Sequence, residues 1–152
     1  MSTATHDTAA TTDAPRALLT RFVDEVLNGH DVDGALDDLV VEDFVEHNPL
    51  PGQGPGRAGL RDVLTGMNAA FPDIHWDVQG TVVEGERIAT FSYWTGTHRG
   101  EFMGIPATGR RVTVEAWTLD RYHDGQLTDS RIIMDVLGLL TQLGVIPAPD
   151  AG

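Results

Sequence analysis

The chain has 152 residues, of which 41% are hydrophobic, so it is long enough for one domain with a buried core. Its formal net charge of −13, from 10 Arg and 23 acidic residues, repels phosphate backbones and anionic membrane surfaces, so we expect no nucleic-acid or membrane partner. The chain has neither Cys nor Lys, which excludes thiolate nucleophiles, cysteine-ligated zinc, Schiff-base lysines and phosphate-binding P-loops.

The first residues predict no folded element. Residues 1–13 are rich in Ala and Thr and have no apolar run and no basic cluster, which is typical of a disordered leader rather than a signal peptide. No stretch reaches the roughly 18 apolar residues of a membrane span. We therefore expect a cytoplasmic protein with a single domain over 14–147 and a flexible tail over 148–152.

The first half of the domain has helical periodicity. Apolar residues recur at helical spacing from Asp13 to the Asn28-Gly29 stop signal, and a shorter helix follows over 35–40. Residues 44–47 predict a short strand, and the Gly/Pro-rich segment 50–56 predicts a loop. A third helix is expected over about 57–71.

The second half has strand periodicity. Runs rich in Val, Ile, Thr, Tyr and Trp predict strands at about 74–84, 86–98, 110–122 and 126–136, before a short helix at 137–143. Compact turn signals between consecutive strands predict antiparallel pairing. The order of the elements predicts an α+β fold, in which a curved antiparallel sheet wraps the N-terminal helices into a cone.

The last strand has a charged face and an aliphatic face. Asp129, Arg131, Ile133 and Asp135 share one face, and Ser130, Ile132, Met134 and Val136 share the other. In one interpretation the charges lie in water and Asp135 caps the final helix. In the other, the charged face lies inside the cone, where burial raises the pKa of Asp135 and a second copy of the chain covers the aliphatic face.

The strand before it does not settle which face is inside. Val112, Val114 and Ala116 are apolar on one side, whereas Trp117 and Leu119 are apolar on the other. A bulge, or burial of both faces, would explain this change of side.

Histidines near strand ends are further site candidates. His47 precedes a proline-bounded loop, and His98 lies in a glycine-flanked segment. With Asp135 they have the composition of a two-His, one-carboxylate iron site, but no local spacing supports it, and the triplet His75-Trp76-Asp77 has very low specificity. We therefore expect no metal.

Three segments together resemble a known family. They are residues 96–109 (GTHRGEFMGIPATG), residues 135–144 (DVLGLLTQLG) and His47-Asn48-Pro49. Their sequence and order resemble the motifs of the SnoaL-like polyketide cyclases, and the resemblance covers roughly residues 16–147.

The resemblance implies an α+β barrel of the nuclear transport factor 2-like superfold, with an internal apolar pocket and no metal or organic cofactor. It implies an intramolecular aldol condensation that closes the last ring of an aromatic polyketide, with Asp135 as general acid/base. His47 would polarise the carbonyl, and Arg131 or Arg121 would stabilise developing negative charge.

A homodimer or homotetramer would form through the sheet. The expected substrate-binding residues are Phe44, Met67, Tyr93, Trp94, His98, Trp117, Leu119 and Ile133.

The chain also departs from the cyclases. An amide and a His on the strand before the catalytic Asp fall here on Leu119 and Arg121, and Arg cannot act as a base at neutral pH. A cofactor-independent polyketide hydroxylase, or a partner of one, therefore stays open as an alternative. An epoxide-hydrolase-like use of Asp129, Arg131 and Asp135, and a non-catalytic ligand-binding or dimerisation module, are further alternatives.

Overall fold

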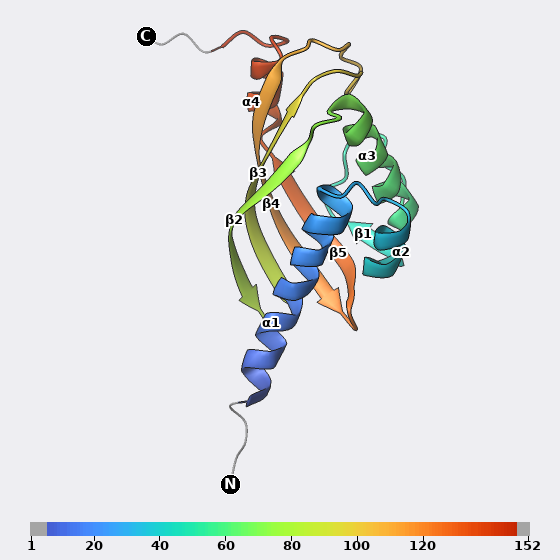
Figure 1. The fold of residues 1–152 in the computed structure, drawn as a ribbon, viewed down its shortest axis with the longest axis vertical. Helices are drawn as coiled ribbons and strands as arrows, with labels where there is room; N and C mark the ends of the chain where they lie inside the picture. Colours follow the sequence, from blue (N-terminus) through green and yellow to red (C-terminus); the bar gives the residue numbers. More distant parts are fainter. Residues whose placement is uncertain (1–5, 149–152) are drawn as a thin grey trace.

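Five strands form one curved sheet, and the larger helices lie over its concave face (Figure 1). The computed structural model describes residues 6–148, with side chains from residue 13 onward. The elements are α1 (His6–Arg21), η1 (Phe22–Leu27), α2 (Gly34–Leu39), β1 (Val40–Glu46), α3 (Gly56–Ala70), β2 (His75–Glu84), β3 (Arg87–Thr97), β4 (Arg111–His123), β5 (Gln126–Met134) and α4 (Val136–Gln142).

The sheet has the strand order β1-β5-β4-β3-β2. The predicted antiparallel pairing is confirmed for β2 to β5, which follow one another in the chain. The first strand, β1, pairs instead with β5 in parallel, so that Glu46 lies opposite Ser130. Because β1 and β2 pair on one side only, the sheet is an open, mixed sheet and not a closed antiparallel barrel.

Strand β4 alternates strictly between the two faces of the sheet. Its even-numbered residues from Val112 to Tyr122 point toward the helices, whereas Trp117 and Leu119 point outward and are 50% and 43% exposed. The predicted explanations for its change of side, a bulge or two-sided burial, are wrong for residues 112–120. The irregularity comes later, between Arg121 and Tyr122, where one extra residue of β5 is accommodated.

The helices begin and end close to the predicted places, with one difference. The first helix begins at His6 and not at the predicted Asp13, and residues 1–5 of the predicted leader lie outside the described part. It continues into η1, a π-helical turn that ends at Leu27 and is capped by Asn28. The Asn28 side chain pairs with both backbone groups of Trp76 at the free edge of β2.

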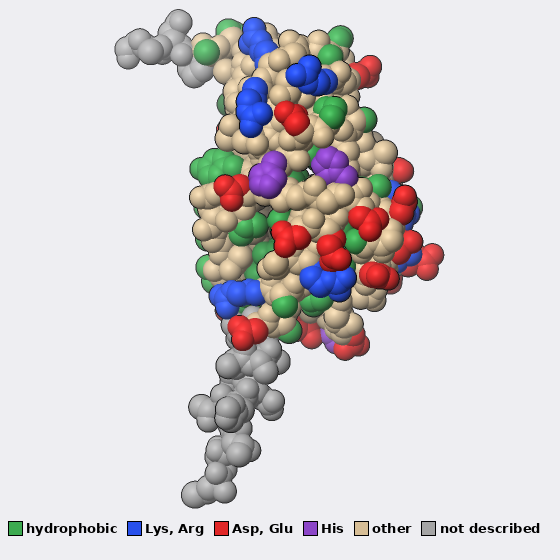
Figure 2. Space-filling model, viewed as in Figure 1, with side chains coloured by type: hydrophobic (Ala, Val, Ile, Leu, Met, Phe, Trp, Pro, Cys, Tyr) green, Lys and Arg blue, Asp and Glu red, His purple; other side chains and the backbone are tan. Residues whose placement is uncertain are grey.

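The surface shows where the negative charge lies. Acidic side chains are densest on the side of the molecule where α2 lies (Figure 2), and six exposed ones fall within residues 31–43. Arg57 and Arg61 of α3 form ion pairs with Asp37, so part of this charge is locally balanced. Among residues 6–148, no helix has the length and apolar character needed to cross a membrane.

His98 holds the loop between β3 and β4. The side chain is completely buried and stacks on Phe71 with ring centroids 5.3 Å apart. Its Nδ1 accepts the backbone N–H of Thr108 at 3.2 Å, and its own backbone pairs with Arg110 and Gly109. The ring therefore joins the two ends of the loop to the core.

Replacing His98 by Ala should lower the free energy of unfolding by about 3 kcal/mol, because it removes the packing of a fully buried ring and the acceptor of the Thr108 N–H. Urea denaturation at pH 7 measures this loss. His98→Asn is the matched control, because its amide oxygen can accept the same N–H, and it should lose clearly less stability. Equal losses in the two variants would contradict a role for the Nδ1 hydrogen bond.

Candidate active site

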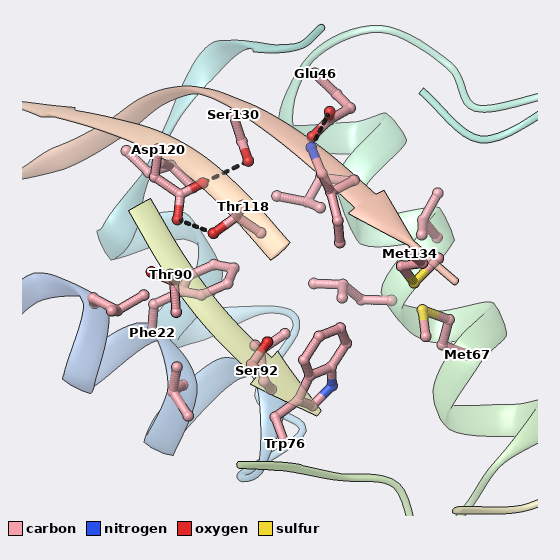
Figure 3. Close-up of a pocket in the computed structure, with 18 of the residues that line it drawn as sticks. Phe22, Glu46, Met67, Trp76, Thr90, Ser92, Thr118, Asp120, Ser130 and Met134 are labelled. Carbon is pink, nitrogen blue, oxygen red and sulfur yellow. Dashed lines mark hydrogen bonds between the residues drawn. The ribbon is translucent and has the colours of Figure 1, made fainter. Parts of the chain in front are cut away.

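A cavity lies between the concave face of the sheet and helices α1, η1 and α3 (Figure 3). Its volume is about 100 Å³, and it is open to solvent at one side. The helices contribute aliphatic and aromatic side chains, among them Phe22, Leu64 and Met67. Most of the polar groups come from the strands, with Gln53 from the loop before α3, so the cavity has a mostly apolar roof and a partly polar floor.

The π-helical turn shapes the roof. Its hydrogen bonding is wider than that of an α-helix, with Asn28 N–H bonded to the carbonyl of Val23 at 2.8 Å. This turn places Phe22, Val23 and Leu27 in the cavity wall. Gly29 follows it at a close approach, because a Cβ there would lie 2.5 Å from the carbonyl oxygen of Glu25.

Asp120 is the enclosed carboxyl group of the floor. Only 6% of the residue is exposed, and it lies on the inward side of β4. The Ser130 hydroxyl of β5 donates to Oδ1 at 2.5 Å, and the Thr118 hydroxyl donates to Oδ2 at 3.0 Å. Both carboxylate oxygens thus have a partner although water is largely excluded.

Burial raises the pKa of Asp120 from 3.8 to about 6, because the charged form loses its hydration. The two hydroxyl donors act in the opposite direction, since they stabilise the carboxylate. The nearby carboxylates of Glu46 and Asp129 raise the pKa further. A carboxyl group with a pKa near 6 can both accept and donate a proton close to neutral pH.

Glu46 is a second acidic side chain in the cavity wall. Its Oε1 accepts the backbone N–H of Asn48 at 2.9 Å and that of Ile132 at 3.0 Å. Burial raises the pKa of Glu46, and these two N–H donors partly offset the effect. The side chains of Glu46 and Asn48 also extend the pairing of β1 with β5 beyond the last residue of the strand.

Asp135 lies outside this cavity. Its carboxylate accepts the N–H of Gly138 at 2.9 Å and caps α4, and the residue is exposed. The prediction that the face of Asp129, Arg131 and Asp135 lines the interior is therefore wrong, and the alternative interpretation as a helix cap is confirmed. The physical reason is packing: Ile132 and Met134 on the opposite face of β5 line the cavity, which turns the charges outward.

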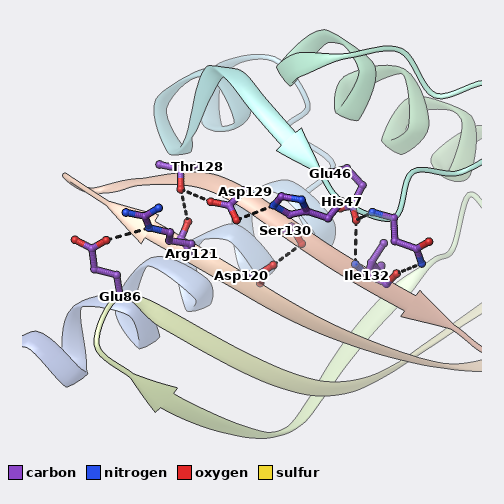
Figure 4. A network of polar contacts seen from close by, with 10 residues as sticks. Glu46, His47, Glu86, Asp120, Arg121, Thr128, Asp129, Ser130 and Ile132 are labelled. Atoms are coloured by element: carbon purple, nitrogen blue, oxygen red, sulfur yellow. Dashed lines mark hydrogen bonds and ion pairs between the residues drawn. The ribbon is translucent and has the colours of Figure 1, made fainter.

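The other predicted catalytic residues also lie on the outer face (Figure 4). The His47 imidazole pairs with Asp129 at 3.1 Å, and the Arg121 guanidinium pairs with Glu86 at 3.2 Å. Arg131 is exposed on the same face. These residues do not contact the cavity, so a catalytic role for them stays a prediction without geometric support.

Two of the predicted substrate-binding residues, Phe44 and Met67, line the cavity. The rest lie elsewhere. Trp94 and His98 are fully buried in the core beside it, and Tyr93, Trp117, Leu119 and Ile133 lie on the outer face of the sheet.

The sequence does contain a signal for Asp120. It continues the even-numbered row Val112, Val114 and Ala116, and this row ends at Tyr122. Apart from Thr118 the other members of the row are apolar or aromatic, and an acidic residue in such a mostly apolar row indicates a buried carboxyl. In the described part of the chain, no group of three His, Asp or Glu side chains is arranged to hold a metal ion.

Comparison with known proteins places this geometry in a family. Residues 17–143 match the model of the SnoaL-like polyketide cyclases. The chain is 34% identical over 101 residues to the aklanonic acid methyl ester cyclase DauD of Streptomyces sp. strain C5, an alignment that spans 66% of this chain and 61% of DauD. It is 33% identical over 106 residues to the aklanonic acid methyl ester cyclase DnrD of Streptomyces peucetius, spanning 66% of this chain and 68% of DnrD.

A solved structure agrees with the fold. AclR of Streptomyces galilaeus, described as a candidate hydroxylase, superposes with a TM-score of 0.79 at 27% identity, over 92% of this chain and 87% of AclR. The helices, the open sheet and the family match over most of the domain therefore lead to one conclusion: the chain belongs to the SnoaL-like polyketide cyclase family.

Proposed function

We propose that this protein catalyses the intramolecular aldol cyclisation of a neutral aromatic polyketide ester, and that Asp120 is its acid/base group. The observation that carries the proposal is the enclosed Asp120 carboxyl on the floor of an apolar cavity, with a pKa of about 6. The relatives DauD and DnrD, named as cyclases of a methyl ester, support this substrate class.

The charges of the cavity favour a neutral substrate. Among its lining residues, the charged ones are Glu46 and Asp120, and both are acidic. A substrate with a free carboxylate would bring a third negative charge into a space of low dielectric constant, which opposes binding. An ester presents the same carbonyl without that charge.

The chemistry needs one proton to leave carbon and one to reach oxygen. The Asp120 carboxylate removes the acidic proton between the ester and ketone carbonyls, and the resulting enolate carbon attacks a second carbonyl carbon. The new C–C bond leaves an alkoxide on the former carbonyl oxygen, and Asp120 returns its proton to that oxygen. The protein thereby positions and desolvates the reacting groups, while conjugation within the substrate spreads the enolate charge.

The size of the cavity fits ring closure at one end of a polycyclic substrate. A cavity of about 150 Å³ holds benzene, so the 100 Å³ of this cavity admits only the reacting edge of a polycyclic substrate. The remaining rings would lie in the open mouth of the cavity. The ring that forms would then lie beside Asp120.

Asp120→Asn should lower kcat for ring closure by about 10²–10⁴-fold, because the amide cannot accept the proton. Cyclisation of an anthraquinone-type ester, followed by liquid chromatography, measures this effect. The matched control is Asp135→Asn, which removes the acid/base group implied by family resemblance. Loss of activity in Asp135→Asn with full activity in Asp120→Asn would reverse the assignment.

Hydroxylation is the second candidate function, because AclR superposes over most of the chain. The same assay run with and without oxygen and a reductant separates the two reactions. Ring closure without oxygen supports the cyclase, whereas incorporation of oxygen into the product supports the hydroxylase. Tight binding of the ester with neither product would indicate a ligand-binding module.

Keeping Asp120 enclosed makes the folded state depend on pH. Its pKa is higher in the folded state than the ordinary 3.8, so the folded state binds the proton more tightly than the unfolded state. Its contribution to stability is therefore complete below pH 4 and is lost as the pH rises through about 6. The change of about two pKa units corresponds to about 3 kcal/mol.

The free energy of unfolding of the native protein, relative to that of Asp120→Asn, should fall by about 2.5 kcal/mol between pH 4 and pH 7. Urea denaturation of both proteins across this range measures the difference. A difference that is constant with pH would show that Asp120 is not held in a desolvated environment.

A second copy of the chain covers the outer face of the sheet in this proposal. Trp117 and Ile133 are 50% and 62% exposed there, next to Leu119 and Tyr93. A shallow hollow lies beside Trp117 and Ile133, with Glu115 and Asp135 at its edge. Such a set of exposed apolar residues on one face is typical of a protein interface.

Light scattering after gel filtration should give a mass of at least twice 16.4 kDa for the native chain and a lower mass for Trp117→Glu. A charge at this position would oppose burial at an interface. Val145→Glu is the control, because Val145 is equally exposed at 51% but follows α4. A monomeric native chain would contradict this part of the proposal.

A further inference from the structure

Glu46 and Asp120 lie in one row across three neighbouring strands. The register places Glu46 of β1 opposite Ser130 of β5, and Ser130 opposite Asp120 of β4 (Figure 4). Since neighbouring strands lie about 4.8 Å apart, the backbones of the two acidic residues are about 10 Å apart. Both side chains line the cavity, with the Ser130 hydroxyl in the row between them.

The Glu46 carboxylate is fixed in the cavity wall. Two backbone N–H groups, of Asn48 and Ile132, donate to the same oxygen, Oε1. These donors stabilise the ionised form and restrict rotation of the side chain away from the cavity. The charge of Glu46 is therefore held at a fixed place relative to Asp120.

Few other charges face Asp120. From β5 it faces the Ser130 hydroxyl, with Asp129 on the outer side of that strand, and from β4 it faces Thr118 and Tyr122. The cavity-lining side chains of β3, α1, η1 and α3 carry no charge. The positive neighbours of Glu46, which are His47 and Arg131, lie on the other face of the sheet. Among the residues whose side chains the structure describes, no cation lines the cavity, so the negative charge of Glu46 acts on Asp120 through a medium of low dielectric constant.

We propose that Glu46 is a positioning residue that makes Asp120 a stronger base, by holding a fixed negative charge in the same cavity wall. The inference rests on the proposed function, because it concerns the same proton transfer. A neighbouring negative charge disfavours a second one, so Asp120 binds a proton more tightly and takes it from carbon more readily. Glu46 itself transfers no proton in this scheme.

Carbon-13 NMR titration of the Asp120 carboxyl tests the coupling without any substrate. The signal is identified by its absence in Asp120→Asn. Glu46→Gln keeps an oxygen for both backbone N–H donors but removes the charge, and it should lower the pKa of Asp120 by about one unit. Asp43→Asn removes the same charge from an exposed position on the same strand and should leave the titration unchanged.

Ser130→Ala gives a shift of the opposite sign. Its hydroxyl donates to the Asp120 carboxylate, so removing it should raise the pKa of Asp120. A general loosening of the cavity would shift the pKa of Asp120 in the same direction in Glu46→Gln and in Ser130→Ala. Opposite shifts therefore separate electrostatic coupling from structural damage.

The pH dependence of cyclisation gives the second readout. In the native protein kcat/KM should rise with pH as Asp120 ionises. In Glu46→Gln this rise should move to lower pH, and the plateau should fall about threefold because a weaker base reacts more slowly. The two curves therefore cross: the variant is more active than the native protein at pH 5 and less active at pH 8.

Titration of Asp120 at the same pH in Glu46→Gln and in the native protein would overturn the inference. If Glu46→Gln does not fold, the titration of Glu46 is measured in Asp120→Asn instead. The interaction between two charges is reciprocal, so removal of the Asp120 charge must lower the pKa of Glu46 by the same amount. A shift of the expected sign without cyclisation of the ester by the native protein would support the coupling and overturn the proposed function. The experiments can therefore contradict the coupling of Glu46 to Asp120 and the proposed cyclisation independently of each other.

Discussion

Asp120 has to be kept away from water without losing its ability to ionise, and the hydroxyls of Ser130 and Thr118 meet this requirement. An enclosed carboxylate without donors is strongly disfavoured and stays protonated over most of the pH range. With one donor for each oxygen, the pKa rises only to about 6. The position of Asp120 therefore depends on the alternation of β4, which puts Thr118 on the same side, and on the pairing of β4 with β5, which places Ser130 opposite Asp120.

The alternation along β4 serves two purposes at once. Its even-numbered side chains point inward, with Thr118 and Asp120 lining the cavity, whereas Trp117 and Leu119 form part of an exposed apolar face. A shift of the register by one residue would exchange these faces and move Asp120 into water. The cavity and the proposed interface thus constrain the same strand from its two sides.

Local patterns were enough to predict most of the secondary structure, because the helical and strand periodicities and the turn signals all lie within short windows. The parallel pairing of β1 with β5 was not predicted, since the residues that it joins, such as Glu46 and Ser130, are far apart in the chain. The family resemblance was correct, but it directed attention to Asp135, whose position before α4 fits a helix cap equally well. The face of a strand is decided by packing across the whole sheet, which explains why Asp120 was missed.

The pairing of β1 with β5 also affects how the protein is made. Strands β2 to β5 form hairpins between neighbours, whereas β1 contacts a partner that leaves the ribosome only after all the other strands. Contacts between distant parts of a chain form slowly, because a long loop has to close first. The wall that carries Glu46 can therefore meet the floor that carries Asp120 only late in synthesis, and a partly made chain has no complete cavity.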